Sequence, residues 1–369
     1  MPCGAEPLPS PLSNADIPRI LAFGPWPPGV PRDVSNRVSG STRAIQFGQQ
    51  LFSDKRLSRD GQRSCASCHQ SALGFSDGLA RAVGIAQVDR NTLGLANLGT
   101  QRWFGWDGAN DNLWAQSLRP LLDVREMGGS TTSLAQTVRR HADLRSGYRR
   151  SFGAAPGHDD ERIAIDLAKA LAAFQETLVT PRTPFDDFRD ALQRGDRAAA
   201  AAYPLAAQRG LALFIGRGRC YVCHSGPTLS NGEFHDIGIP HFVAPGRVDA
   251  GRYGGIKLLQ ASRYNLLGPF NDDSTRGSAT STRHVELQHR NFGEFKVPSL
   301  RNLARTAPYM HNGSLATLRD VLRHYSDLPE ERLHADGERL LVPLHLSPAE
   351  TDDLMAFLDS LNEAATRPR

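Results

Sequence analysis

The sequence predicts an all-α protein that contains two similar domains and long loops. The signature Cys-x-x-Cys-His occurs twice, at residues 65–69 and 220–224, and similar sequence flanks both copies. Apolar residues recur at three- and four-residue intervals in several segments, whereas the alternation typical of strands is sparse. We therefore expect an N-terminal extension over residues 1–40, a first domain over 41–195 and a second domain over 196–369.

The repeat extends well beyond the signature. Upstream, "AIQFGQQLF" (44–52) and "AAQRGLALF" (206–214) share Ala, Gln, Gly, Leu and Phe at the same offsets. Downstream, "ANLGTQRWFGWDG" (96–108) corresponds to "RNLARTAPYMHNG" (301–313). Self-similarity of this kind indicates one module used twice.

Each module carries an amphipathic helical pattern. Residues 159–178 open with acidic side chains suited to a helix N-terminus and continue with Ile163, Leu167, Leu171, Phe174 and Leu178 at helical spacing. Residues 347–361 open with Ser347, with Pro348 at the first helical position and Glu350 three residues after the serine, which predicts a capping box. The stretch from about 238 to 296 is rich in Gly, Pro, Ser and Asn, so we expect a long loop that wraps the second module.

Composition narrows the class of protein. The 369 residues are 40% apolar and 22% charged with a net charge of +4, which is typical of a globular protein and shows no basic block of the nucleic-acid-binding kind. No apolar run approaches the ~20 residues of a membrane span. The start, "MPCGAEPLPS", does not resemble a signal peptide, so either the protein is cytosolic or a signal has been removed.

The cysteines carry the chemistry. Four of the five lie in the two signatures and only Cys3 is left over, which excludes a disulfide framework. Cys3 is either an unpaired thiol or the acylated first residue of a trimmed lipoprotein.

The signature predicts c-type haem. Two thiols one helical turn apart can form thioethers with the two vinyl groups of a haem, and the next residue, His69 or His224, places its imidazole under the iron. The alternatives are a four-cysteine zinc site or a thioredoxin-like redox pair, neither of which needs a histidine after each cysteine pair. Because bacteria attach haem c outside the cytoplasm, we expect a periplasmic protein.

The segments around the signatures resemble a known family. "RNTLGLANLG", "WFGWDGANDNLWAQSLRPLLDVREMG" and "FKVPSLRNLARTAPYMHNGSLATLRDVLRHY" resemble the bacterial di-haem cytochrome c peroxidase superfamily, and within it the MauG-like (MbnH-like) branch. The resemblance covers roughly residues 40 to 365. It implies two cytochrome c-like haem domains, the first with the peroxide-reactive haem and the second with an electron-transfer haem.

The resemblance implies a distal pocket on the first haem. It is built from Gln116, Pro120 and Glu126, which follow Trp106 by 10, 14 and 20 residues. A carboxylate in an enclosed pocket can act as general acid and base toward peroxide, and Glu126 has that role. Many members have a histidine that blocks the first iron at the position of Ile85, so the first site here is expected to be open and five-coordinate.

The two haems are expected to differ in their sixth ligand. When the repeats are aligned on their shared Asn-Leu motif, Pro120 of the first module meets Tyr325 of the second. Tyr325 is therefore expected to ligate the second iron opposite His224, as the resemblance also implies, and Trp106 is expected to carry electrons between the haems. The competing ligands are Met310, His311 and His324.

The resemblance also implies a calcium ion between the domains. Its ligands are Asn91 through the side chain and Thr306 and Pro308 through backbone carbonyls, and oxygen ligands of this kind suit calcium.

These expectations define an enzyme that reduces hydrogen peroxide. The electrons come from an amino-acid side chain of a partner protein, as in MauG-like enzymes, or from a small redox protein, as in conventional cytochrome c peroxidases. A non-catalytic di-haem electron carrier is the alternative from another class, but such a protein has no use for the pair Gln116 and Glu126.

Overall fold

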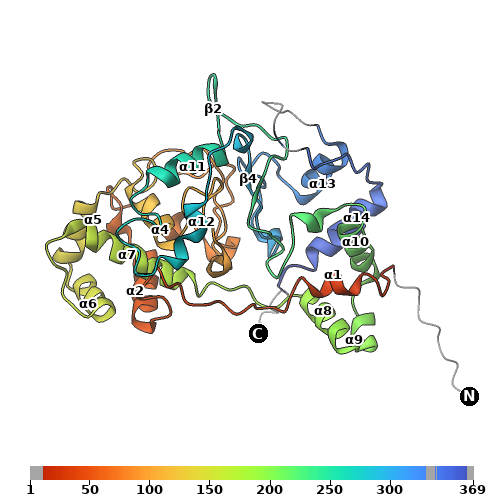
Figure 1. The fold of residues 1–369 in the computed structure, drawn as a ribbon, viewed down its shortest axis with the longest axis horizontal. Helices are drawn as coiled ribbons and strands as arrows, with labels where there is room; N and C mark the ends of the chain where they lie inside the picture. The colour runs from red at the N-terminus through yellow and green to blue at the C-terminus, as the bar shows by residue number, and fades with distance from the viewer. Residues whose placement is uncertain (1–10, 330–336, 338, 364–369) are drawn as a thin grey trace, which may run out of the picture.

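The computed structural model describes residues 11–329, 337 and 339–363 of the chain (Figure 1). Cys3 lies outside the described residues. The α-helices are α1 (Ile17–Leu21), α2 (Thr42–Phe52), α3 (Cys65–Cys68), α4 (Leu113–Leu122), α5 (Thr131–Arg140), α6 (Ala142–Phe152), α7 (Asp160–Gln175), α8 (Pro184–Arg194), α9 (Arg197–Ala201), α10 (Leu205–Ile215), α11 (Arg252–Ala261), α12 (Thr280–Arg283), α13 (Leu318–Asp327) and α14 (Pro348–Asp359). The strands are β1 (Phe234–His235), β2 (Phe242–Ala244), β3 (Arg247–Val248) and β4 (Phe295–Lys296).

The predicted all-α class is confirmed. The strands are two or three residues long and form two antiparallel pairs, β1 with β4 and the hairpin β2 with β3. Within the described residues, no helix is both long enough and apolar enough to cross a membrane.

The helices gather into two groups, each around its own apolar core. In Figure 1, α2 and α4 to α7 lie in one half of the molecule, and α10, α13 and α14 lie in the other. The first core holds large side chains such as Phe47, Trp114 and Leu171, and the second holds Phe214, Leu322 and Phe357. The two haem signatures therefore belong to separate cores.

The same helix contact occurs once in each half. In α2, Gly48 lies so close to α7 that a Cβ atom there would overlap the carbonyl oxygen of Ala170. In α10, Gly210 approaches the carbonyl oxygen of Asp353 in α14 in the same way. A glycine is required at both positions because the helix backbones are nearly in contact.

The loops between these helices also match, at a constant separation of 205 residues. Asn97 and Asn302 both adopt the left-handed conformation, with φ of 65° and 58°, at the start of a short 3₁₀ turn. Each is followed by an isolated β-bridge, Phe104 with Asn110 in the first half and Tyr309 with Leu315 in the second. These matched features support the predicted repeat.

The two helical patterns in the sequence form the predicted helices. α7 begins behind Asp159, whose side chain accepts a hydrogen bond from the Arg162 amide, and it ends before Leu178. α14 begins with the predicted capping box, in which Ser347 and Glu350 accept each other's backbone N–H groups.

Two expectations about the halves differ from the structure. The stretch 238–296 contains α11 and α12 and wraps the first half, because Tyr264 donates to Glu161 and Lys169 pairs with Asp272. Nothing in its local sequence indicated which half it would cover. In addition, α8 precedes residue 195 but packs into the second core through Phe185 and Phe188, so the change from one core to the other comes before α8.

Candidate active site

One large cavity lies between the two halves. Its volume is about 1090 Å³, at the upper end of the roughly 300–1,000 Å³ of ordinary ligand pockets. Both signatures line it, together with the predicted distal residues of the first half and Tyr325 of the second. The structure therefore brings together the site residues that were predicted from separate parts of the sequence.

Each signature folds into a tight turn that presents its histidine to the cavity. The amide of His69 donates to the Cys65 carbonyl at 2.9 Å, and the amide of His224 donates to the Cys220 carbonyl at the same distance. The cysteines of each signature therefore lie about one turn apart with the histidine at the end of that turn, as attachment of a haem requires.

Both imidazoles are held in one orientation. The Nδ1 atom of His69 lies 2.8 Å from the Phe75 carbonyl oxygen, and Nδ1 of His224 lies 3.0 Å from that of Leu229. A carbonyl can only accept, so Nδ1 carries the proton and Nε2 keeps its lone pair for a metal. Burial lowers the pKa of His69 and lowers that of His224 to about 4, which keeps both rings neutral.

The placement of the cysteines bears on the zinc alternative. Within the part of the chain that the structure describes, no three or more His, Cys, Asp or Glu side chains are grouped as a metal site would require. Burial raises the pKa of the Cys65 and Cys220 thiols to about 12, so both are uncharged thiols, not thiolates, at physiological pH. The geometry thus favours thioether attachment over the zinc alternative.

The predicted distal residues lie on and just after α4. Gln116 and Pro120 occupy successive turns of that helix and line the cavity. The side-chain oxygen of Gln116 accepts a hydrogen bond of 2.8 Å from the side-chain amide of Asn110. The Gln116 NH₂ group remains as a donor and has no hydrogen-bond partner among the described residues. Pro120 has no donor or ligand atom in its side chain, so it offers no ligand to the cavity.

Glu126 lies on the same wall, and burial raises the pKa of its carboxyl above the ordinary value, while Arg119 opposes that shift. The backbone around it is fixed by the loop that contains Ile85, whose amide donates to the Glu126 carbonyl at 3.0 Å. The sequence analysis did not predict a role for Gly84. A Cβ atom at Gly84 would overlap the Glu126 backbone, so a glycine at this position allows the loop that contains Ile85 to contact the segment that contains Glu126.

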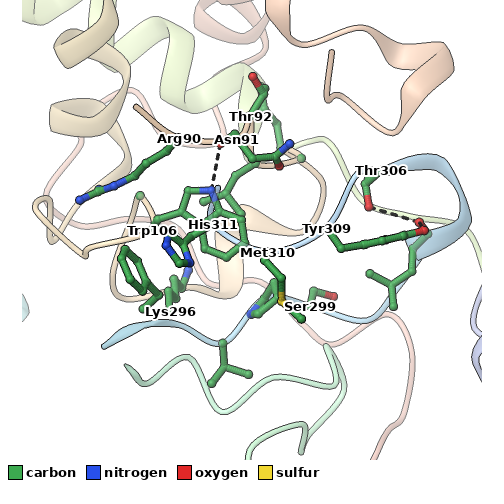
Figure 2. Close-up of a pocket in the computed structure, with 18 of the residues that line it drawn as sticks. Arg90, Asn91, Thr92, Trp106, Lys296, Ser299, Thr306, Tyr309, Met310 and His311 are labelled. Atoms are coloured by element: carbon green, nitrogen blue, oxygen red, sulfur yellow. Dashed lines mark hydrogen bonds between the residues drawn. The ribbon is translucent and has the colours of Figure 1, made fainter. Parts of the chain in front are cut away.

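Trp106 lies on the cavity wall between the two halves (Figure 2). Its indole N–H donates to the carbonyl oxygen of Asn91 at 2.9 Å, and the Asn91 amide donates in turn to the His311 carbonyl at 2.8 Å. The indole is thereby fixed to both halves.

Tyr325 occupies the position in α13 that Pro120 occupies in α4. The caps of the two helices, Asn112 and Thr317, are 205 residues apart, as are Pro120 and Tyr325. Tyr325 lines the cavity within electrostatic range of Cys220 and Cys223, and burial raises the pKa of its phenol.

The competing ligands are placed differently. Nε2 of His324 lies 2.9 Å from the Ile237 carbonyl, and His324 is not among the cavity-lining residues. Met310 and His311 do line the cavity, but the ring of His311 is stacked on Phe295 with centroids 3.5 Å apart.

The predicted calcium ligands lie on the cavity wall, where Asn91, Thr306 and Pro308 come from the two halves. The side-chain amide of Asn91 donates to the Leu79 carbonyl at 2.8 Å, which leaves its side-chain oxygen as an acceptor. These are neutral oxygen atoms of the type that calcium accepts.

Comparison with known proteins identifies this arrangement. The family of di-haem cytochrome c peroxidases matches residues 42–194. The methylamine utilization protein MauG of Methylorubrum extorquens is 36% identical over 361 residues, which are 97% of this chain and 88% of that protein. This chain belongs to the MauG and di-haem cytochrome c peroxidase family.

Further relatives support the membership. The cytochrome-c peroxidase IdrP1 of Denitromonas iodatirespirans is 32% identical and covers 92% of this chain, with 86% of its own length matched. The crystal structure of a MauG-like protein associated with microbial copper homeostasis superposes with a TM-score of 0.68 at 28% identity, over 92% of this chain and 94% of that one.

As a member of this family, the protein is a haem oxidoreductase that acts on peroxide and carries two c-type haems. The residues present fit two such groups. Each signature offers two neutral thiols and one imidazole with a free Nε2, and one cavity is continuous with both signatures.

Proposed function

We propose that the first haem, held by Cys65, Cys68 and His69, is the peroxide-reactive one, and that the second, held by Cys220, Cys223 and His224, is capped by Tyr325. The observation that carries this proposal is the pair of equivalent positions in α4 and α13, where Pro120 has no ligand atom and Tyr325 has a phenol oxygen. The first half is thus suited to a haem whose sixth ligand position is open, and the second half to a haem whose sixth position is filled.

When bound, the haems supply the iron at which hydrogen peroxide is reduced and the means of storing oxidising equivalents. Glu126 holds and moves the proton: as a carboxylate it accepts a proton from one peroxide oxygen, and as an acid it returns that proton to the other oxygen, which leaves as water. Burial raises the pKa of Glu126, which makes its carboxylate a better proton acceptor. The free NH₂ group of Gln116 is available to orient peroxide by donating a hydrogen bond.

We infer that the electrons come from a side chain of a partner protein. A phenolate favours the oxidised states of iron, so a haem capped by Tyr325 serves poorly as an entry point for ordinary reductants. Trp106 carries electrons between the haems in this proposal, which is supported by the hydrogen bond that fixes its indole to Asn91 on the cavity wall. The second candidate, a peroxidase that draws electrons from a small redox protein, is favoured by the similarity to the cytochrome-c peroxidase IdrP1.

The proposal also includes a bound calcium ion and the cellular compartment of the protein. Asn91, Thr306 and Pro308 offer neutral oxygens where the halves meet, and a calcium ion there would link them. Because haem c is attached outside the bacterial cytoplasm, we place the protein in the periplasm. Removing calcium with a chelator is expected to loosen the contact between the halves.

The experiment that tests the second haem is Tyr325→Phe. The ferric second haem should lose its low-spin, six-coordinate EPR signature, since the variant removes only the phenol oxygen. Tyr309→Phe is the matched control, because Tyr309 also lines the cavity but its hydroxyl donates to the Leu303 carbonyl. A second haem that keeps its spectrum in Tyr325→Phe would show that another residue is the ligand, with Met310 and His311, which also line the cavity, as the first candidates.

A further inference from the structure

Lys296 is a buried cation without a counter-charge. Its side chain is 6% exposed, at the end of β4, and it faces the cavity (Figure 2). Its ammonium contacts the side-chain oxygen of Gln101 and lies 6.0 Å from the centre of the Phe104 ring. Among the described residues no carboxylate forms an ion pair with it. A neutral amide does not compensate the cost of burying a charge.

The other buried lysine of the chain shows the usual arrangement. Lys169 is also fully buried, and its ammonium pairs with the Asp272 carboxylate at 2.5 Å and donates to the Phe270 carbonyl at 2.7 Å. Lys296 has the same burial without the carboxylate. Burial lowers the pKa of Lys296 to about 7, as expected of an ammonium that lacks a partner.

A second unsatisfied atom lies on the same wall. Nε2 of His311 is buried and has no hydrogen-bond partner among the described residues, and its ring is stacked on Phe295, the residue before Lys296. Two basic side chains from the second half therefore face the cavity next to Trp106 (Figure 2). His311 lies within electrostatic range of the Asp249 carboxylate, whereas burial alone accounts for the lowered pKa of Lys296.

We propose that Lys296 binds a propionate carboxylate of the haem attached to Cys65 and Cys68, and so holds the first haem from the second half of the chain. The carboxylates Asp107 and Asp249, which also line the cavity, are paired with Arg90, so a haem propionate is the group that can supply a counter-charge to Lys296, whereas hydrogen peroxide is neutral. Lys296 belongs to β4 of the second half, but its backbone amide donates to the Trp106 carbonyl at 2.8 Å. Its ammonium neighbour Phe104 belongs to the first core, against which Cys65 packs.

Binding of the propionate would affect both Lys296 and the first haem. A charge-assisted hydrogen bond to a carboxylate keeps the ammonium charged and compensates its burial. A positive charge beside the haem also favours the reduced iron, so Lys296 raises the reduction potential of the first haem. The inference rests on the two haems of the family and is independent of the proposed role of Tyr325.

The direct test is a crystal structure of the haem-loaded protein. The Lys296 ammonium should lie within about 4 Å of a propionate oxygen of the haem on Cys65 and Cys68, the usual limit for an ion pair. An ammonium that contacts no propionate, or only one from the other haem, would overturn the assignment. This test uses the unaltered chain, so it does not depend on the folding of a variant.

The second test is a potentiometric titration of Lys296→Met, with Lys296→Arg and Lys257→Met alongside. Lys257 is exposed in α11 and serves as the matched control. Haem content is measured first, and two haems per chain show that the binding sites are intact. The first haem should then titrate at a lower potential in Lys296→Met, while Lys296→Arg and Lys257→Met stay close to the unaltered protein. Unchanged potentials in Lys296→Met would overturn the proposal.

Discussion

Glu126 lies in an environment that its local sequence does not indicate. It follows Asp123 and Arg125 in a short polar turn, yet it faces a cavity and burial raises the pKa of its carboxyl. We expect Glu126→Gln to slow the reaction with peroxide by roughly 100-fold or more, because the amide keeps the volume but cannot transfer the proton. Stopped-flow absorbance after mixing with peroxide measures this rate.

The control for that variant is Glu176→Gln. Glu176 is another carboxyl whose pKa is raised by burial, but it does not line the cavity. Its variant should react with peroxide at the normal rate. In the unaltered protein, the rate should fall as the pH decreases through the pKa of Glu126, since the protonated form cannot accept a proton. Equal rates in both variants would remove Glu126 from the mechanism.

Glu176 itself affects stability. One of its oxygens accepts from the Ser39 hydroxyl at 2.7 Å and the other has no partner among the described residues, and burial raises the pKa to about 7 from 4.5. The folded state therefore binds a proton more tightly than the unfolded chain, and the free energy of unfolding falls as the pH rises from 4.5 to 7.

The Glu176→Gln variant removes that dependence. Relative to the unaltered protein, it should gain about 1–2 kcal/mol between pH 4.5 and pH 8, a figure reduced for the partial exposure of the group. Urea unfolding at several pH values measures the difference. A constant difference across this range would show that the carboxyl is not protonated in the folded state.

At the scale of the elements, the two close helix crossings determine how each half packs. Gly48→Ala and Gly210→Ala place a methyl group against the backbone of α7 or α14, and overpacking of this kind costs about 1–3 kcal/mol. The loss should exceed the gain in helix propensity, which is about 1 kcal/mol.

Gly254→Ala in α11 is the control for these substitutions. There, the added methyl group would meet only the Ala250 side chain at 3.4 Å, so helix propensity should leave the variant equal to or more stable than the unaltered protein by up to about 1 kcal/mol. Thermal unfolding followed by circular dichroism compares the three variants. A stable Gly48→Ala variant would mean that α2 can move away from α7.

Elements were predicted well where the signal is local. The capping box at Ser347, the helix behind Asp159 and the equivalent positions of Pro120 and Tyr325 could all be read from spacing. The Tyr325 ligation itself stays a prediction.

Features that depend on tertiary contacts could not be read in this way. The burial of Lys296 and the close approach at Gly84 arise from segments distant in sequence. The wrapping of the first half by residues 238–296 has no periodic signature, because it is fixed by single ion pairs and hydrogen bonds such as that between Lys169 and Asp272.

At the scale of the whole molecule, Arg90 links the two halves. Its guanidinium pairs with Asp107 at 2.6 Å and with Asp249, in the wrapping segment, at 2.7 Å. Both carboxylates are buried, and Arg90 holds the pKa of each below its usual value. Removal of this cation leaves two buried carboxylates close together, with only Arg119, 3.7 Å from Asp107, to compensate them among the ion pairs of the described residues.

We therefore expect Arg90→Met to lower the free energy of unfolding by about 3–5 kcal/mol, the cost of breaking a buried ion pair from one side. Arg319→Met, which breaks an exposed pair with Asp352, should change it by less than about 1 kcal/mol. Because the wrapping segment joins the halves, haem absorbance and far-ultraviolet circular dichroism should report one common urea transition in the unaltered protein. Two separated transitions in Arg90→Met would show that this ion pair couples the halves, whereas a stability equal to that of Arg319→Met would show that it does not.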